Sequence, residues 1–164
     1  MSFEDSYLGK LRKHVGNAEL LAPGAQVLLL TDEDHAIFQR RADSGLWEIP
    51  AGSAEPGQSF LDTAVAEVSE ELGLLLNGET LTAFATFSDP VEHRLVYPNG
   101  DIVHAFALCF VARNWSGEIR PDPTEVREWG VYPLTAPPDG LQRATRLVLD
   151  LYLAFRETGR FQAK

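Results

Sequence analysis

The stretch GSAEPGQSFLDTAVAEVSEELGL, residues 52–74, constrains the fold more than any other part of the chain. Ser59 is a favourable helix N-cap residue, and Asp62 three positions later completes a capping-box pattern. Gly73 is a typical helix stop. Apolar residues between these points recur at helical spacing and define one face, made of Leu61, Ala64, Val65, Val68 and Leu72. The pattern predicts a capped amphipathic helix that follows a glycine-containing loop.

Three glutamates, Glu67, Glu70 and Glu71, lie within five positions of this helix. At about 100° per residue they fall on one edge, beside the apolar face. Exposed like charges at this spacing cost roughly a few tenths of a kcal/mol per pair. One interpretation is a solvated acidic face, which is the common fate of a run of charges. The other is a site for a divalent cation such as Mg²⁺, which takes carboxylate and phosphate oxygens as ligands.

The composition indicates one globular domain, residues 1–164, and disfavours binding to nucleic acid. The formal net charge of the 164 residues is -10, which disfavours general attraction to phosphates. No apolar run approaches the roughly 18 residues of a membrane helix, and no signal-peptide segment stands at the start. Cys109 is the single cysteine, so no disulfide framework is expected. We therefore expect a cytoplasmic protein that binds neither nucleic acid nor membrane.

Strand-like runs dominate the rest of the chain, with an N-terminal segment at 1–24 and a helical pattern near the C-terminus. The Asn99-Gly100 pair, between two such runs, is typical of a tight hairpin turn. A short helix is predicted at 7–15 and a longer one at 141–156, within a C-terminal segment at 139–158. The predicted strands are 25–31, 35–40, 46–50, 81–88, the two arms of 92–113, and 125–133. This order of elements predicts an α/β or α+β sandwich.

The loop and helix at 52–74 resemble the Nudix box, G-x5-E-x7-R-E-U-x-E-E-x-G-U, where U is a bulky aliphatic residue. Seven of the nine specified positions match: Gly52, Glu67, Val68, Glu70, Glu71, Gly73 and Leu74. The flanking segments FQRRADSGLWEIPAG, PNGD and GEIRPDPTEVREWGVYPL are also similar to those of family members, so the resemblance covers roughly residues 25–134. It implies the Nudix fold, an α/β/α sandwich with a mixed β-sheet between helices.

The resemblance also implies an activity and a set of site residues. Members of the family mostly use Mg²⁺ or Mn²⁺ to hydrolyse the phosphoanhydride bond of a nucleoside diphosphate linked to another group. By position, Glu67, Glu70 and Glu71 and the carbonyl of Ala51 resemble the metal ligands. The general base is either a box glutamate, Glu67 or Glu70, or a carboxylate on a later loop. Glu125 is our candidate there, although an exposed loop carboxylate explains it equally well.

Two positions depart from the box. Gln58 stands where the family has glutamate, and Ala66 stands where it has arginine. The box arginine braces the catalytic loop through charge-assisted hydrogen bonds, which alanine does not make. The metal ligands remain, so one hypothesis is an enzyme whose loop is braced differently. The alternative is a catalytically weak or inactive module that binds a nucleotide or regulates another protein.

The segment WEIPAG resembles that of ADP-ribose pyrophosphatases, which favours ADP-ribose or a nucleotide sugar as a small-molecule substrate. Nucleoside triphosphates and dinucleoside polyphosphates stay open as alternatives. Candidate substrate-binding residues are Arg40, Arg41, Glu48 and Arg94, each of which a surface role explains as well. His93, beside Arg94, is a further candidate for a phosphate or ribose contact. The apolar face of the C-terminal helix suits either the core or the partner subunit of a homodimer.

Overall fold

The computed structural model describes residues 3–97 and 99–164. Its helices are η1 (Phe3–Asp5), α1 (Tyr7–Val15), α2 (Phe60–Leu72), η2 (Gly78–Thr80) and α3 (Arg143–Thr158). Its strands are β1 (Leu20–Leu29), β2 (His35–Arg41), β3 (Trp47–Glu48), β4 (Ala51–Ser53), β5 (Thr82–Phe87), β6 (Arg94–Val96), β7 (Ile102–Ala112), β8 (Val126–Pro133) and β9 (Gln162–Ala163).

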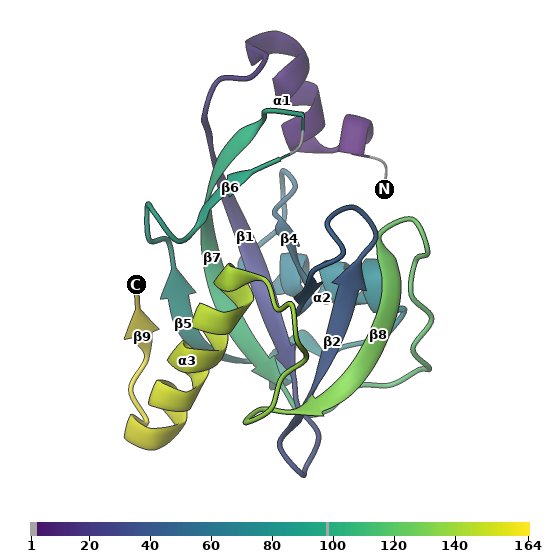
Figure 1. Ribbon diagram of the computed structural model, residues 1–164, viewed down its shortest axis with the longest axis vertical. Helices are drawn as coiled ribbons and strands as arrows, with labels where there is room; N and C mark the ends of the chain where they lie inside the picture. Colours follow the sequence, from purple (N-terminus) through teal and green to yellow (C-terminus); the bar gives the residue numbers. More distant parts are fainter. Residues whose placement is uncertain (1–2, 98) are drawn as a thin grey trace.

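The strands form two sheets (Figure 1). The larger has the order β4-β1-β7-β5-β9, with β6 paired to β7, and the smaller has the order β3-β2-β8. The larger sheet is mixed, because β1 runs parallel to β7 whereas β4 runs antiparallel to β1. In this arrangement β4, which begins the glycine loop before α2, is an edge strand beside β1.

Two hydrophobic clusters lie on opposite faces of the strands, and alternation along β1 builds both. Leu28 belongs to the cluster that packs against α3, and Val27 and Leu29 belong to the cluster that packs against α2. Figure 1 shows α3 in front of the strands and α2 behind them. The predicted α/β sandwich, with mixed strands between helices, is therefore confirmed.

Local signals located the helices well. The helix predicted at 7–15 is α1, and α2 carries the predicted capping box, in which Ser59 Oγ accepts from Asp62 N–H at 3.1 Å. Gly73 ends α2 in the left-handed conformation with φ 71°. The hairpin predicted in 92–113 also forms, with β6 antiparallel to β7. Pro98, within its turn, lies outside the described residues.

The predicted buried face of α2 was partly wrong. Leu61 is 41% exposed, whereas Glu71 is only 3% exposed and lies among the buried residues of the helix. The helix is rotated so that Ala64, Val68 and Leu72 meet the sheet together with Glu71. The three glutamates therefore do not share one environment: Glu70 is exposed, Glu67 is partly buried and Glu71 is buried.

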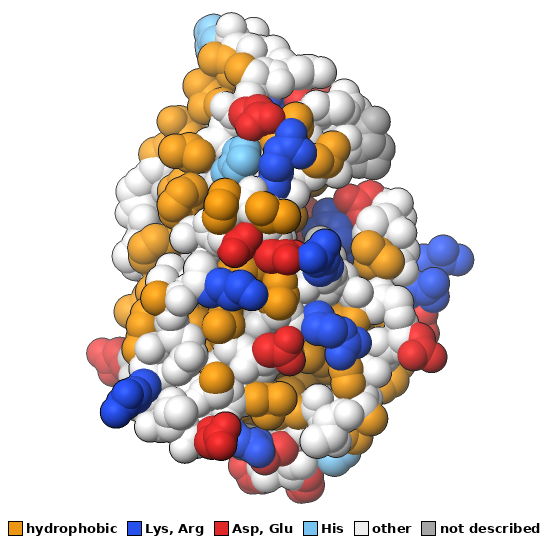
Figure 2. Space-filling view, turned by 60° about the vertical axis from the view of Figure 1, so that its left-hand side comes forward, with side chains coloured by type: hydrophobic (Ala, Val, Ile, Leu, Met, Phe, Trp, Pro, Cys, Tyr) orange, Lys and Arg blue, Asp and Glu red, His pale blue; other side chains and the backbone are white. Residues whose placement is uncertain are grey.

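Charge is distributed evenly over the surface that Figure 2 draws, despite the formal net charge of -10. Acidic and basic side chains are interspersed on that face rather than gathered by sign. A bound anion would therefore meet local groups rather than a broad positive field. In the described part of the chain, no helix combines the length and the apolar character needed to cross a membrane.

Candidate active site

The carboxylate of Glu67 lies directly against the backbone of Gly52. A Cβ atom at position 52 would overlap the Glu67 carboxylate, so a side chain here is incompatible with this approach. Burial, together with the nearby charges of Glu70 and Glu125, raises the pKa of Glu67 to about 7. Glycine at the start of the loop thus lets a carboxylate that resists ionisation reach the edge of β4.

Glu71 is the most buried of the three glutamates, and its Oε2 accepts a hydrogen bond from the backbone N–H of Ala51 at 3.2 Å. Burial raises its pKa well above the ordinary value, and the charges of Glu48 and Glu67 add to the effect. The backbone hydrogen bond from Ala51 acts in the opposite direction. One helical turn of α2 therefore directs Glu67 and Glu71 at neighbouring residues of β4.

Glu48 joins this group of carboxylates from β3. It is 4% exposed, and its burial raises its pKa although Arg41 donates a hydrogen bond from Nη1 to Glu48 Oε1 at 2.9 Å. Arg41 also holds Asp43 through two hydrogen bonds of 2.8 Å, which lower the pKa of Asp43 to about 2. A single guanidinium therefore links one exposed and one buried carboxylate.

Gln39 lies between the two most buried carboxylates. It is paired with Glu48 across the β2–β3 ladder and is 1% exposed. Hydrogen bonds from its amide lower the pKa of both Glu48 and Glu71, against the effect of burial. Its Oε1 is buried without a hydrogen-bond partner among the described residues. This is an unsatisfied polar atom at the centre of the acidic group.

The loop that enters α2 is braced by neutral and backbone hydrogen bonds where the box arginine and glutamate are missing. Gln58 Oε1 accepts from the backbone N–H of Glu55 at 3.0 Å and from Thr63 Oγ1 at 3.3 Å. Glu55 in turn accepts two hydrogen bonds, of 2.8 and 3.0 Å, from the backbone N–H of Tyr7 at the start of α1. Ala66 takes no part in these contacts.

Glu125 lies on the loop before β8, close enough for its charge to raise the pKa of Glu67. Its backbone carbonyl accepts a hydrogen bond from Ala42 N–H at 2.8 Å. A register shift separates the Arg40–Glu128 and Arg41–Val126 pairs of the β2–β8 ladder. This irregularity next to Glu125 fits the way in which bulges redirect side chains beside a site. The side chain of Glu125 is exposed.

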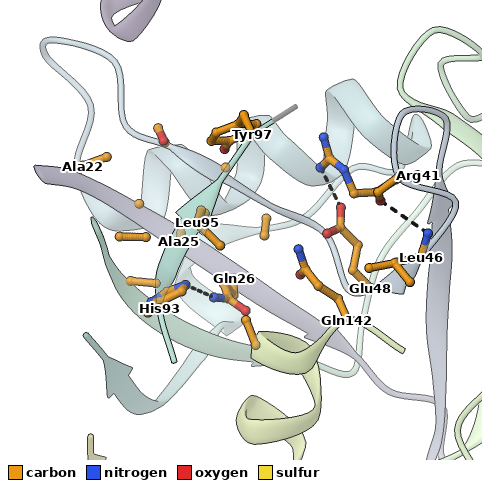
Figure 3. Close-up of a pocket in the computed structure, with 18 of the residues that line it drawn as sticks. Ala22, Ala25, Gln26, Arg41, Leu46, Glu48, His93, Leu95, Tyr97 and Gln142 are labelled. Carbon is orange, nitrogen blue, oxygen red and sulfur yellow. Dashed lines mark hydrogen bonds and ion pairs between the residues drawn. The ribbon is translucent and has the colours of Figure 1, made fainter. Parts of the chain in front are cut away.

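A cavity of about 260 Å³ adjoins this acidic group. Its wall includes Arg41, Glu48, Ala51 and Gly52 at one side and His93 at the other. Figure 3 shows the Arg41–Glu48 contact on the opposite side of the cavity from His93 and Gln26. The sequence motif and the cavity therefore meet at β4.

Of the candidate residues, Arg41, Glu48 and Ala51 line this cavity. The side chains outside its wall are Glu67, Glu70, Glu71, Glu125, Arg40 and Arg94. Among the described residues that line it, neither Arg40 nor Arg94 occurs. Arg40 donates to the carbonyl of Gly45 at 2.8 Å and contacts Glu128 at 3.3 Å. Arg94 contacts Glu19 at 2.9 Å. The cavity brings together Arg41 and Glu48, while Arg40 and Arg94 contact other parts of the surface.

Sequence reasoning missed Gln26, Gln39 and Gln142, which lie in or beside the site. Gln39 interrupts an apolar strand segment, and a polar residue at such a position is a usable signal. Gln26 likewise adjoins a run of apolar residues in β1. Gln142 precedes α3 without a side-chain capping bond and lines the cavity. Only the packing of distant segments brings Gln39 to Glu48 and Glu71 and places Gln26 and Gln142 in the cavity wall.

The residues of this site fit a divalent cation by their chemistry. Among residues 3–97 and 99–164, no group of three or more His, Cys, Asp or Glu side chains is assembled as a metal cluster. Burial nevertheless raises the pKa of Glu48, Glu67 and Glu71, and the charges of Glu48 and Glu67 raise the pKa of Glu71 as well. Gln39 Oε1 has no hydrogen-bond partner among the described residues. A hard cation with oxygen ligands would stabilise the ionised form of such a group.

Known proteins resemble this chain over most of its length. Residues 20–152 match the model of the NUDIX domain. A relative, the NAD-capped RNA hydrolase NudC of Pseudomonas putida, is 31% identical over 137 residues, which is 80% of this chain and 45% of that protein. The chain spans less than half the length of the first curated relatives that it matches.

Solved structures share the fold. The MutT NUDIX hydrolase from Burkholderia pseudomallei aligns with a TM-score of 0.66 at 23% identity, over 80% of this chain and 97% of that one. An ADP-ribose pyrophosphatase from Streptococcus suis aligns with a TM-score of 0.61 at 21% identity, over 87% and 98% of the two chains. Since the family model spans most of the sequence, the chain belongs to the NUDIX family.

Proposed function

We propose that this chain is a Mg²⁺- or Mn²⁺-dependent pyrophosphohydrolase. Its substrate is a nucleoside diphosphate linked to another group, with ADP-ribose or a nucleotide sugar favoured. The observation that carries the proposal is the pair of carboxylates, Glu67 and Glu71, which contact Gly52 and Ala51, two residues that line the cavity. Such a pair is costly to keep ionised unless a cation or a proton compensates it.

In this proposal Glu67, Glu70 and Glu71 and the carbonyl of Ala51 hold the metal. When bound, the metal neutralises the diphosphate and acidifies the attacking water. Water adds its oxygen to one phosphorus atom, the bridging P–O bond breaks, and two phosphate monoesters leave. The proton of the water passes to a carboxylate oxygen, for which Glu125 on its anchored loop is the candidate, with Glu67 or Glu70 as the alternative.

Arg41 is the cationic side chain among the described residues that line the cavity. Its guanidinium lines the cavity while it contacts Glu48 and Asp43, so a diphosphate in the cavity has one fixed cation at hand. Arg40 and Arg94 stay candidates for the outer part of the substrate. Glu48 keeps Arg41 in place and, with Gln39, completes the polar wall beside Glu71.

The named relatives bear on the choice of substrate. One solved neighbour is named an ADP-ribose pyrophosphatase, another a UDP-X diphosphatase, and the Pseudomonas relative an NAD-capped RNA hydrolase. All three names describe a diphosphate that joins a nucleoside to a second group, which supports this substrate class. The third name includes RNA, so our expectation that no nucleic acid is bound stays a prediction.

The test is a hydrolysis assay with Mn²⁺ on ADP-ribose and a panel of nucleotide sugars, with products identified by mass. We expect AMP and ribose 5-phosphate from ADP-ribose, and at least about a hundredfold lower kcat for Glu67→Gln, because one metal ligand and its charge are lost. Glu79 is exposed and lies outside the box, so Glu79→Gln is the control and should retain activity. Equal turnover by wild type and Glu67→Gln would refute the role of Glu67.

The second candidate function is a nucleotide-binding or regulatory module without catalysis. The replacements Gln58 and Ala66, which leave the loop braced by neutral contacts, are the observation that favours it. It predicts that the panel yields measurable binding but no cleavage of any compound. Cleavage of any member by the wild type, abolished in Glu67→Gln, excludes it.

A further inference from the structure

The end of the cavity away from Arg41 is a recess formed by small side chains on two paired strands. In the β1–β7 ladder Ala22 is paired with Ala105 and Gly24 with Ala107. All four residues line the cavity, and alternation places them on the same face as the α3-side core. Because none carries more than a methyl group, the recess is flat and apolar. Such a surface suits a planar ring.

The polar side chain at the edge of this recess is Gln26, and His93 fixes its orientation. His93 Nδ1 lies 2.9 Å from the carbonyl oxygen of Phe87, which only accepts, so Nδ1 carries the proton. His93 Nε2, which lies 3.1 Å from Gln26 Nε2, must therefore accept from the Gln26 amide. Both side chains are buried, at 3% and 6% exposure, and the imidazole stacks on Phe87 at a centroid distance of 4.3 Å.

This hydrogen bond determines which atom of Gln26 remains for a ligand. The nitrogen is directed at His93, so the carbonyl oxygen Oε1 occupies the other arm of the amide. Within the described residues, Oε1 receives no hydrogen bond, and Gln26 lines the cavity. Burial lowers the pKa of the His93 imidazole, which favours its neutral form. The wall thus presents a hydrogen-bond acceptor of fixed orientation beside an apolar recess.

We propose that Gln26 is a specificity-determining residue: its Oε1 accepts a hydrogen bond from the exocyclic amino group of a nucleobase that lies on Ala22, Ala105 and Ala107. His93 is the positioning residue, because it keeps the amide from rotating. The inference rests on the proposed function, since it places the base at one end of the cavity and the diphosphate at the Arg41 end. Figure 3 shows that these two ends face each other across the cavity.

The experiment measures binding without hydrolysis. Dissociation constants are determined calorimetrically for AMP and for purine ribonucleoside 5′-monophosphate, which lacks the amino group. Wild type should bind AMP at least about tenfold more tightly, because one hydrogen bond to a buried acceptor is lost with the analogue. Gln26→Leu should bind both compounds equally and about as weakly as wild type binds the analogue.

Two further variants separate recognition from structure. His93→Phe keeps a ring on Phe87 but removes the acceptor that orients the amide, so the preference for AMP should fall by about threefold or more. Gln142→Leu removes an amide from the same cavity and should keep the preference. Thermal unfolding of each variant shows that it is folded. A preference retained in Gln26→Leu, or lost in Gln142→Leu instead, overturns the proposal.

The outcome is independent of the proposed chemistry. A wild-type protein that prefers AMP but cleaves nothing would support the role of Gln26 and contradict the pyrophosphohydrolase. A protein that cleaves ADP-ribose yet binds AMP and its analogue equally would support the pyrophosphohydrolase and contradict the role of Gln26.

Discussion

Replacing Glu67 by glutamine should stabilise the metal-free protein, and more so at alkaline pH. The pKa of Glu67 is about 7 in the folded chain against 4.5 for an unperturbed glutamate. The native state therefore binds more protons than the unfolded state between these values, so the stability of the wild type falls as the pH rises through this window. The raised pKa of Glu67 therefore lowers the free energy of unfolding by at most about 3 kcal/mol at pH 8 and by about 1 kcal/mol at pH 5.

The assay is urea unfolding of wild type and Glu67→Gln in the presence of a chelator at pH 5, 6, 7 and 8. We expect the free energy of unfolding of the variant to exceed that of the wild type by an amount that grows with pH toward about 3 kcal/mol. This difference corresponds to a shift in Tm of roughly 5 to 10 °C. Saturating Mg²⁺ should stabilise the wild type at pH 8 by about 3 kcal/mol at a hundredfold excess over Kd, and the variant far less.

Glu79→Gln is the matched control, because Glu79 is exposed and should show no such trend. A difference between wild type and Glu67→Gln that is constant with pH would refute the reasoning, as would a variant less stable than the wild type at pH 8. Either result would mean that Glu67 is not held in a poorly solvated position next to Gly52.

Three other substitutions test separate contacts. Gly52→Ala places a Cβ against the Glu67 carboxylate, so kcat for ADP-ribose should fall more than about tenfold while circular dichroism shows the fold intact. Ser59→Ala removes the N-cap of α2 and should cost about 1 kcal/mol in urea unfolding; no loss would mean that the cap is dispensable. Arg41→Ala leaves Glu48 buried without its cation and should lower the free energy of unfolding by about 2 kcal/mol. The double variant Arg41→Ala/Glu48→Gln should recover part of this loss. Additive losses in the double variant would contradict the coupling between the two residues.

The parts of the fold that sequence predicts well depend on interactions between near neighbours. The capping box of Ser59 and Asp62, the left-handed stop at Gly73 and the Asn99-Gly100 turn all arise from residues a few positions apart. Glu67, likewise, is recognisable because the box fixes its distance from Gly52 along the chain. These local rules locate α2 and its loop without knowledge of the sheets.

The remaining features depend on how distant segments pack. The rotation that buries Glu71 and exposes Leu61 follows from where α2 meets the sheet, which the helical spacing alone leaves open within a turn. The division of strands into two sheets brings Gln39 between Glu48 and Glu71. The contact between Gln26 and His93 joins residues 67 positions apart. No periodicity in the sequence contains such information.

We propose that Glu67 and Glu71 bind a divalent cation that in turn binds a diphosphate. The decisive measurement is anomalous diffraction at the manganese edge, from crystals grown with Mn²⁺ and a non-hydrolysable ADP-ribose analogue. We expect a manganese peak within about 2.5 Å of carboxylate oxygens of both residues and of a phosphate oxygen. A bound analogue with no manganese at either carboxylate would contradict it.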